Sequence, residues 1–495
     1  MTPANGSPDP DPHDPRPRSA GFPGADPATL PADARPATDP ASAAGPVGEQ
    51  ATVPVDPTAR RGSTRALRTS RTGVTRGLGG KFRSALADTT PLNTLEFRRL
   101  WGAGVVTTIG AQLTVVAVPV QIYALTQSSA YVGLTGLFGL VPLVVFGLWG
   151  GAIADAMDRR TLLLATGAGI SLVSLGLWVV AASGVGSVWL VLIMFAVQQG
   201  LLAINQPTRS AVLPRILPAT ELPAANALNM TVFQFGAIVG PVMAGALIPL
   251  IGLSTLYLVD AIALLATLWA TWRLPKLPPR TTDSGLRPTA GLRDVLAGFR
   301  YVATQKILLV SFLVDIIAMA FGMPRAVFPE MAERTFHDPP GGGIALGLLY
   351  ASIAIGAVAG GLFSGWLHRI RRQGVAVILA IGVWGLGVTV FGLTHLLWLA
   401  VAALAVAGAA DLVSAVFRST MLQVVATDEM RGRMQGVFIV VVAGGPRLAD
   451  IWHGPAADAI GTGAASAVGG IAVLVATAIT VVLLPAFWRY TAPIR

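Results

Sequence analysis

The chain has 495 residues, of which 53% are hydrophobic and only 12% are charged, and its mean hydropathy of +0.65 indicates a membrane protein. Cysteine is absent, which excludes a disulfide framework, a thiolate metal site and a cysteine nucleophile. The net charge of +10 would suit a nucleic-acid partner, but the basic residues lie in short loops and in a tail. We therefore attribute the charge to membrane topology and expect no nucleic acid.

Residues 1–90 are rich in Pro, Ala and Asp and then in Arg, and they contain no apolar run that builds a core. We therefore expect a disordered cytoplasmic tail without the hydrophobic segment of a signal peptide. Its basic end, from Arg60 to Arg83, is predicted to lie against anionic membrane lipid of the cytoplasmic leaflet.

Twelve apolar segments of about 20 residues follow, each long enough to cross a hydrocarbon core as a helix. The sequence thus predicts an all-α polytopic membrane protein. Six spans are expected at 100–124, 131–153, 162–182, 188–205, 224–250 and 255–272, and six more at 307–328, 344–367, 375–393, 398–417, 434–455 and 465–487.

Charge tests this count, because Lys and Arg are retained in cytoplasmic loops. Alternate loops carry the arginines, and the other loops carry almost none, Arg334 being the exception. Both termini are therefore predicted to be cytoplasmic. The basic loops hold Arg159 and Arg160, Arg209 and Arg215, the segment 273–306, Arg369, Arg371 and Arg372, and Arg431 and Arg433.

The longest of these loops, 274–306, separates a six-helix half at 91–273 from a second half at 307–487, and a short cytoplasmic tail follows at 488–495. In the second part of the loop apolar residues recur at helical spacing, which predicts an amphipathic helix along the membrane surface. The halves also repeat each other, since Arg209-Ser210 after the fourth span is echoed by Arg418-Ser419 after the tenth.

The segment between the second and third spans resembles the signature that major facilitator transporters carry there. Its residues are Gly151, Asp155, Asp158, Arg159 and Arg160. The resemblance implies two pseudo-symmetric six-helix halves with a substrate site between them. It also implies that Asp155 accepts from the N-terminus of the eleventh helix and closes the cytoplasmic side. The simpler alternatives are a solvated carboxylate and arginines that only fix topology.

A motif in the fifth span, Gly236, Gly240, Pro241 and Gly245, resembles the Gly-rich motif of the superfamily's antiporters and implies export. Segments 116–122, 296–300 and 420–423 further resemble the bacterial enterobactin exporter branch. That resemblance implies outward movement of siderophores or drugs, usually against protons. Two features depart from the superfamily: Gly365 stands where a carboxylate would complete the second half's signature, and no arginine lies deep in the fourth span.

Ionisable residues inside spans are costly in lipid, which makes them functional candidates. Asp260 and Asp458 are expected nearer the outer surface. The structural alternative for such residues is an ion pair, as between Arg447 and the aspartate three positions later. The candidates for proton coupling are Asp315, which is our first choice, Asp411 and Asp450.

Amide and charged side chains in the spans are candidates for binding the solute, because a mostly apolar cavity with a few polar groups suits a large amphipathic molecule. They are Gln112, Gln121, Gln198, Gln199, Asn205, Asn229, Gln234 and Arg325. Helix packing is the simpler role for any one of them.

No phosphate-binding loop, no H-E-x-x-H motif and no soluble catalytic domain is found, so we predict neither an enzyme nor a bound cofactor or metal. The leading hypothesis is a monomeric, proton-coupled exporter of a siderophore or similar amphipathic small molecule in the cytoplasmic membrane of a bacterium. One alternative is a broad multidrug efflux pump in which Asp315 and Asp411 recognise cations. Another is a non-transporting scaffold that recruits a partner through its tail.

Overall fold

The structure is a computed structural model that describes residues 88–278, 300–425 and 428–491, with the backbone alone described for 148–152, 154–156 and 428–440. The predicted tail up to residue 87 and most of the predicted linker helix lie outside the described residues, as does the side chain of Asp155. From Arg76 onward the chain forms one compact unit.

Twelve long helices make up most of the described residues, and they confirm the predicted all-α fold. The first half holds α2 (Leu95–Thr126), α3 (Ser129–Ala156), α4 (Arg159–Ala182), α5 (Val188–Ile216), α6 (Leu222–Ile251) and α7 (Leu253–Trp272). The second half holds α9 (Lys306–Gly322), α11 (Ile344–Leu362), α12 (Gln373–Leu393), α13 (Leu397–Val425), α14 (Asp428–Ile460) and α15 (Thr462–Leu483).

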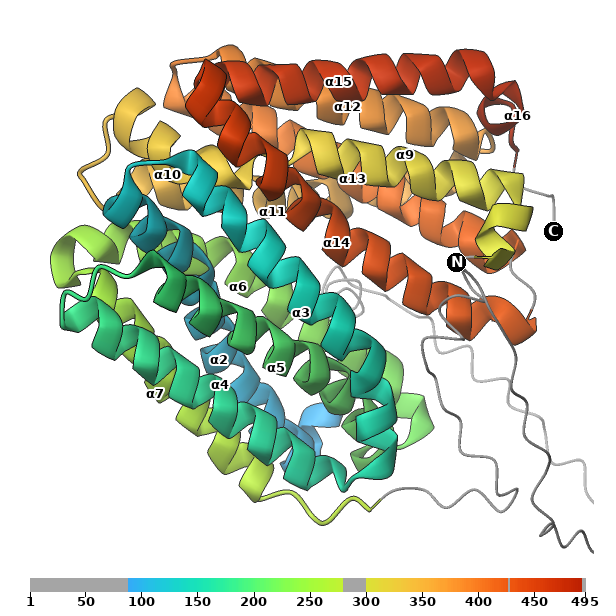
Figure 1. Cartoon of the computed structure of the whole chain (residues 1–495). Coiled ribbons are helices and arrows are strands. Elements are labelled where there is room, and N and C mark those ends of the chain that lie inside the picture. The colour runs from blue at the N-terminus through green and yellow to red at the C-terminus, as the bar shows by residue number, and fades with distance from the viewer. Residues whose placement is uncertain (1–87, 279–299, 426–427, 492–495) are drawn as a thin grey trace, which may run out of the picture. The chain divides into compact units, whose positions relative to one another are not determined.

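Eleven of these helices are long and apolar enough to span a membrane. The twelfth is α14, whose described part carries Arg447, Asp450 and Asp458 within a few turns. In Figure 1, α2 to α7 form one group of helices and α9 to α15 another, with α3 lying beside α14 where the groups meet. The charges that make α14 unusual are therefore on the helix that faces the other half.

Single glycines turn the chain between the last two helices of each half. Gly252 lies between α6 and α7 with φ of +78°, and Gly461 lies between α14 and α15 with φ of +87°. Only glycine adopts such backbone angles without steric cost. A glycine with positive φ thus precedes the last helix of each half, which is the structural counterpart of the sequence repeat.

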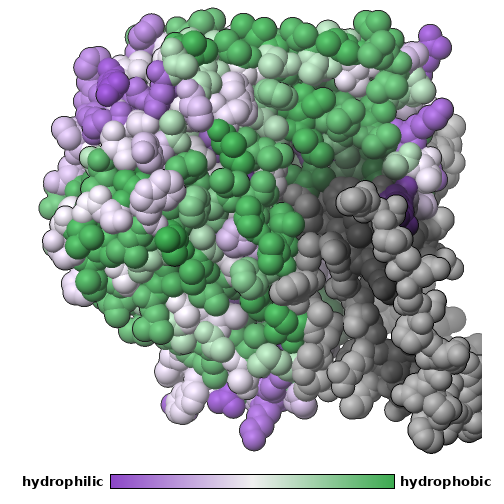
Figure 2. Space-filling view, in the orientation of Figure 1, coloured by the Kyte–Doolittle hydropathy of each residue, from purple (hydrophilic) through white to green (hydrophobic). Residues whose placement is uncertain are grey.

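We name the two ends of the helix bundle by their residues. The arginine end carries Arg159, Arg160, Arg215, Arg273 and Arg369, and the serine end carries the Ser128–Ser129 turn, the Gly252 turn and the loop at 336–343. Figure 2 shows apolar side chains covering the helices on the face drawn, with hydrophilic side chains gathered toward the ends. This pattern is expected when the helix sides face lipid.

The seventh span is broken, contrary to the continuous helix predicted at 307–328. Here α9 ends at Gly322, and a 3-10 turn η3 (Arg325–Val327), the short α10 (Phe328–Glu330) and a π turn η4 (Met331–Thr335) carry the chain to the serine end. Pro324 explains the break, because it lacks a backbone N–H and clashes with the preceding turn. The predicted fourth and tenth spans are also too short: α5 and α13 continue to Ile216 and Val425.

Glycines bring the two halves into close contact along two helix pairs. Gly133 on α3 and Gly454 on α14 face each other: a Cβ on Gly133 would lie 3.1 Å from the Cα of Gly454. On the second pair, Gly245 of α6 packs against Gly347 of α11. Small residues let helix backbones approach each other closely inside a membrane. All four glycines lie toward the serine end.

The α6–α11 contact yields a test of this packing. A methyl group on Gly347 would lie 2.6 Å from the carbonyl oxygen of Pro241, a backbone atom that cannot rotate away. Gly347→Ala should therefore lower the free energy of unfolding by about 1–3 kcal/mol, measured by thermal unfolding of the full chain in detergent. Gly382→Ala is the matched control, because no atom lies within 4 Å of its added methyl group. Equal melting temperatures for the two variants would contradict this packing.

Candidate functional site

A cavity of about 240 Å³ lies between the two halves. Its apolar lining comes mainly from the first half and consists of Val115, Pro119, Val132, Phe195, Leu202, Ala326 and Pro446. The polar lining comes from both halves and consists of Thr135, Gln199, Arg325, Tyr350, Arg447 and Asp450. A mostly apolar wall with a few convergent polar groups is typical of a small-molecule site.

Three charged side chains converge on this cavity from the second half. Arg447 on α14 donates to the side-chain oxygen of Gln199 at 2.7 Å and to the carbonyl of Ala443 at 2.9 Å. Arg325 reaches the cavity from the break in the seventh span, where it begins the turn η3. Asp450 makes no ion pair within 4.0 Å among the described residues, so the predicted Arg447–Asp450 pair is not formed, and its Oδ1 is buried without a hydrogen-bond partner.

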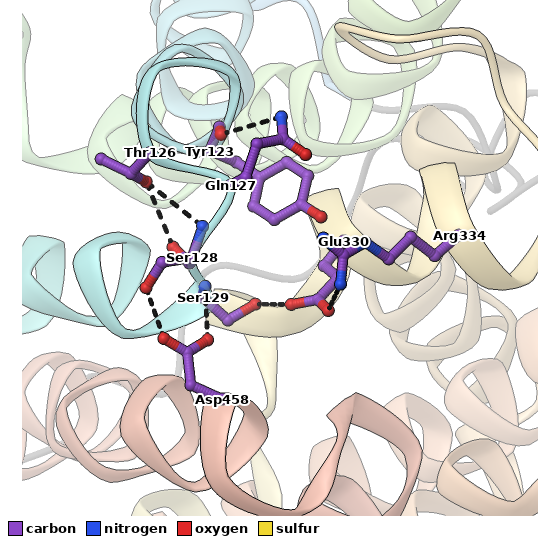
Figure 3. Close-up of polar contacts among 8 residues, drawn as sticks. All are labelled: Tyr123, Thr126, Gln127, Ser128, Ser129, Glu330, Arg334 and Asp458. Carbon is purple, nitrogen blue, oxygen red and sulfur yellow. Dashed lines mark hydrogen bonds and ion pairs between the residues drawn. The ribbon is translucent and has the colours of Figure 1, made fainter.

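A polar cluster at the serine end joins the halves (Figure 3). Asp458 on α14 accepts from the hydroxyl of Ser128 and, at 2.9 Å, from the backbone N–H of Ser129. The Ser129 hydroxyl donates to Glu330 at 2.6 Å, and Glu330 accepts a second bond, of 2.9 Å, from Arg334. A carboxylate is favoured at a helix N-terminus, where backbone N–H groups lack partners. Asp458 therefore caps α3 from the opposite half.

These contacts cover one side of the cavity. Val132 and Thr135 line the cavity one to two turns along α3 from Ser129, and Asp450 lies eight residues, or about 12 Å, along α14 from Asp458. Among the described residues, the hydrogen bonds between the halves are those of this cluster and the Arg447–Gln199 bond. The cavity is therefore closed off on its serine-end side.

A second charged cluster lies inside the second half. Arg418 on α13 forms an ion pair with Asp315 on α9 and a longer one, of 3.6 Å, with Asp411 on its own helix. The side chains of Arg418 and Asp315 are 5% and 3% exposed, whereas that of Asp411 is 34% exposed. Two of the three predicted coupling residues thus share one arginine. Asp411 is the partly exposed member of this cluster.

The role of Arg418 is missed by sequence reasoning, because the predicted tenth span ends one residue before it. A signal was present: Arg418 follows Asp411 by seven residues, which is two helical turns and the same helix face. Its repeat counterpart Arg209 behaves differently. Arg209 lies within α5, and among the described residues its guanidinium donates to the carbonyl of Leu100 at 3.4 Å.

Asp158 of the signature segment begins α4 as its N-cap. It accepts from the backbone N–H of Thr161 at 2.9 Å and from the backbone N–H of Leu277 at 2.7 Å. Burial by itself would raise the pKa of Asp158, but these hydrogen bonds outweigh it and lower the pKa below its ordinary value. Asp158 therefore ties the chain after α7 to the start of α4, within the first half.

The arginines of the same segment also bind within the first half. Arg159 donates to the carbonyl of Ala211 on α5 at 3.2 Å, and Arg160 donates to the carbonyl of Trp272 at the end of α7 at 2.6 Å. The predicted contact of Asp155 with α14 lies outside the described side chains and stays a prediction, and Gly151 is described only as part of the α3 backbone.

The antiporter-like motif on α6 divides its glycines between two neighbours. Gly236 and Gly240 pack against Thr108 and Gln112 of α2, inside the first half. Gly245, one turn and a half further on, packs against α11 of the other half, and the carbonyl of Pro241 lies beside Gly347. The motif therefore serves both packing within its half and the contact between halves.

Of the eight predicted amide and charged cavity residues, Arg325 and Gln199 line the described cavity. Gln121 accepts from the hydroxyl of Tyr257 at 2.8 Å, and Gln198 donates to Ser174 at 3.3 Å, both inside the first half. Asn205, further along α5 than Gln199, donates to Thr166 at 2.7 Å, also inside the first half. The remaining three, Gln112, Asn229 and Gln234, are half-buried side chains that do not line the described cavity.

Residues 86–489 match the family described as transmembrane secretion effector. The chain belongs to this family of major facilitator transporters. The family is one of transporters and not of enzymes, and it confirms the resemblance found in the signature segment. The chain is 28% identical to the enterobactin exporters EntS of Shigella boydii serotype 18 and Escherichia coli O1:K1 over 344 residues, which cover 69% of this chain and 80% of each relative.

Solved structures with the same fold share little sequence with this transporter. The nucleoside transporter NupG superposes with a TM-score of 0.61 at 16% identity, covering 79% of this chain and 98% of that one. An inward-facing bacterial homologue of the iron transporter ferroportin gives a TM-score of 0.60 at 11% identity, covering 79% and 98%. At such identities the likeness establishes the major facilitator fold, with two six-helix halves.

The serine-end cluster is tested by removing its cross-half cap. Asp458→Ala should leave the α3 N-terminus unsatisfied and loosen the closed end, so that a cysteine introduced at Val132 reacts faster with a membrane-impermeant maleimide. Because the chain has no native cysteine, this single label is unambiguous. Asp338→Ala is the control: Asp338 caps α11 within its own half, accepting from Ala345 and Leu346, so its loss should leave labelling unchanged. Unchanged labelling in Asp458→Ala would refute a role of the serine-end cluster in holding that end closed.

The Arg418 cluster is tested by breaking its buried pair. Arg418→Gln leaves the Asp315 carboxylate buried without a cation and should lower the free energy of unfolding by about 3–5 kcal/mol. Adding Asp315→Asn should recover part of this loss, since no buried charge is then stranded. Arg209→Gln, at the repeat position without a carboxylate partner in the described residues, should cost less. Equal losses in denaturant unfolding for the two arginine variants would contradict the assignment.

Proposed function

We propose that this transporter exports a siderophore or a similar amphipathic small molecule in exchange for protons, by alternating access, across the cytoplasmic membrane of a bacterium. The observation that carries the proposal is the cavity between the halves, lined from both sides and covered at the serine end. Similarity to enterobactin exporters supports the class of solute and the outward direction.

Orientation follows from charge. Arginines gather at the arginine end, and Arg334 is the exception at the serine end among the described residues. Retention of basic loops in the cytoplasm favours the arginine end as cytoplasmic, with both chain termini on that side. The serine-end cluster then lies toward the outside of the cell. An exporter in this state takes up its solute from the cytoplasm.

The chemistry of the cavity favours a solute with both hydrogen-bond acceptors and donors on an apolar frame. Arg325 and Arg447 offer N–H groups to catechol, carbonyl or carboxylate oxygens. Asp450 has a buried oxygen free to accept an O–H or N–H group of the solute. Phe195 and Tyr350 supply aromatic surface.

Asp450 supports exchange of solute for protons. As a carboxylate it only accepts hydrogen bonds, whereas its protonated form carries a donor and loses acceptor capacity. A proton and a hydroxyl-bearing solute therefore compete for Asp450, and such competition is the requirement for antiport. Asp315 and Asp411 are the second candidates, because protonation of either weakens its hold on Arg418.

The multidrug alternative assigned cation recognition to Asp315 and Asp411. Both carboxylates pair with Arg418, and neither lines the described cavity, so this arrangement favours a role in coupling over direct contact with a cationic drug. The scaffold alternative rests on the tail, which lies outside the described residues. We propose a monomer because one chain supplies both walls of the cavity.

The test uses the full-length protein in inverted membrane vesicles with an acidic interior. Enterobactin or a dye added outside should accumulate and release protons from the lumen in the wild type. Asp450→Asn should abolish solute-driven proton release while preserving exchange of labelled for unlabelled solute, which needs no proton.

Thr135→Val is the matched control, because Thr135 lines the same cavity but carries no titratable group; it should release protons as the wild type does. Release retained in Asp450→Asn and lost in Asp315→Asn would move coupling to the Arg418 cluster. Absence of both transport and exchange for every solute would refute the exporter.

A further inference from the structure

Asp260 is a buried carboxyl group that none of these roles uses. It lies on α7, in the part of the helix nearer the serine end, and is 1% exposed. Two hydroxyl groups donate to its Oδ2 at 2.8 Å each: Thr114 from α2 and Ser174 from α4. Its other oxygen, Oδ1, is buried without a hydrogen-bond donor. One carboxyl thus joins three helices of the first half through a single oxygen.

No cation accompanies this carboxyl group. Asp260 makes no ion pair within 4.0 Å among the described residues, and α6 and α7 carry no other charged side chain. Tyr257, the titratable group one turn away, donates to Gln121 instead. Counted along their own helices from Thr114, Ser174 and Gln198, the nearest charged residues of α2, α4 and α5 lie 11 to 15 positions, or about 16–22 Å, toward the arginine end. They are Arg99, Arg160 and Arg209, and from the other half Arg447 reaches Gln199, the residue after Gln198.

A carboxylate buried without a cation is costly, whereas the neutral acid is not. The hydrogen-bond pattern also matches the acid. In a neutral carboxyl group the carbonyl oxygen accepts and the other oxygen carries the proton. Oδ2 accepts from two hydroxyl groups, and Oδ1 receives no donor. The geometry therefore assigns the proton to Oδ1.

The surroundings of Asp260 connect it to the cavity. Gln198 on α5 donates to Ser174 at 3.3 Å, so a chain of hydrogen bonds runs from α5 to the carboxyl group. The next residue, Gln199, lines the cavity and accepts from Arg447 of the other half at 2.7 Å. Separation of the halves at this place breaks the Arg447–Gln199 bond and admits water beside the chain that ends at Asp260.

We propose that Asp260 is a proton-binding site of the first half, occupied while the Arg447–Gln199 contact is closed and released when the halves separate there. On release the O–H bond at Oδ1 breaks and the proton passes to water of the opened cavity. The proposal rests on the proton-coupled transport proposed above. It adds a carboxyl group in the half opposite Asp315, Asp411 and Asp450.

The second half lacks an equivalent group. Its last helix, α15, contains no charged residue and packs through glycines, with Gly470 lying against Thr389 and the carbonyl of Gly385 on α12. Asp260 is therefore not a common packing device of both halves, and its hydroxyl partners are specific to α2 and α4 of the first half.

The test reads protonation directly and then transport. Infrared spectra of the full chain in liposomes, recorded at each of several pH values with and without solute, should contain at acid pH the carbonyl stretch of a buried protonated carboxyl that is absent in Asp260→Asn. Thr114→Val and Ser174→Ala should shift this band, which assigns it even if Asp260→Asn does not fold. In inverted vesicles, Asp260→Asn should lower the number of protons released per solute while preserving solute exchange.

Two outcomes would overturn the proposal. Absence of a carboxylic acid band sensitive to Thr114 and Ser174 would mean that Asp260 is ionised. A band that persists at every pH, with and without solute, together with unchanged proton stoichiometry in Asp260→Asn, would make Asp260 a permanent clasp. Failure of the exporter itself is seen separately, as loss of solute exchange in the wild type.

Discussion

A polar group inside a lipid bilayer must find its partner within the protein, because hydrocarbon offers none. This constraint accounts for the placement of nearly every charge described here. At the arginine end, Arg159, Arg160 and Arg215 donate to the backbone carbonyl groups of Ala211, Trp272 and Pro278. Inside the spans, Arg418 holds two carboxylates, and Asp260 is held by two hydroxyl groups. Two carboxyl groups, Asp450 at the cavity and Asp260 inside the first half, each keep one buried oxygen without a hydrogen-bond partner.

The same constraint explains why the halves meet through glycine and serine. Lipid gives apolar helices little reason to prefer each other, so close backbone approach and hydrogen bonds must provide the attraction. Close backbone approach between the halves occurs at four glycines: Gly133, Gly245, Gly347 and Gly454. Hydrogen bonds between the halves come from the hydroxyl and the backbone N–H of Ser129. Such contacts are individually modest and free of bulky interlocking side chains, which suits an interface that must open and close.

The broken seventh span and the charged α14 act together. After the break at Pro324, Arg325 lines the cavity and Glu330 lies beside Ser129. One irregular segment therefore contributes to both the solute site and the serine-end cluster. On α14, Arg447 and Asp450 face the cavity while Asp458 caps α3. Movement of the broken seventh span or of α14 therefore changes the contacts both at the cavity and at its serine end. This linkage is the physical requirement for alternating access.

The sequence by itself determined the all-α membrane fold, the number of helices and their grouping into two halves, because hydropathy and loop charge are set locally along the chain. It also singled out Asp315, Asp411, Asp450 and Arg325 as charges worth attention, since any such residue in a span is costly. It did not reveal that Arg418 joins the first two, which of the neighbouring candidates Gln198 and Gln199 reaches the cavity, or that Asp458 caps α3. Those facts depend on which helix faces surround each residue. Helix rotation and packing between segments far apart in the chain decide them, and only the tertiary structure sets both.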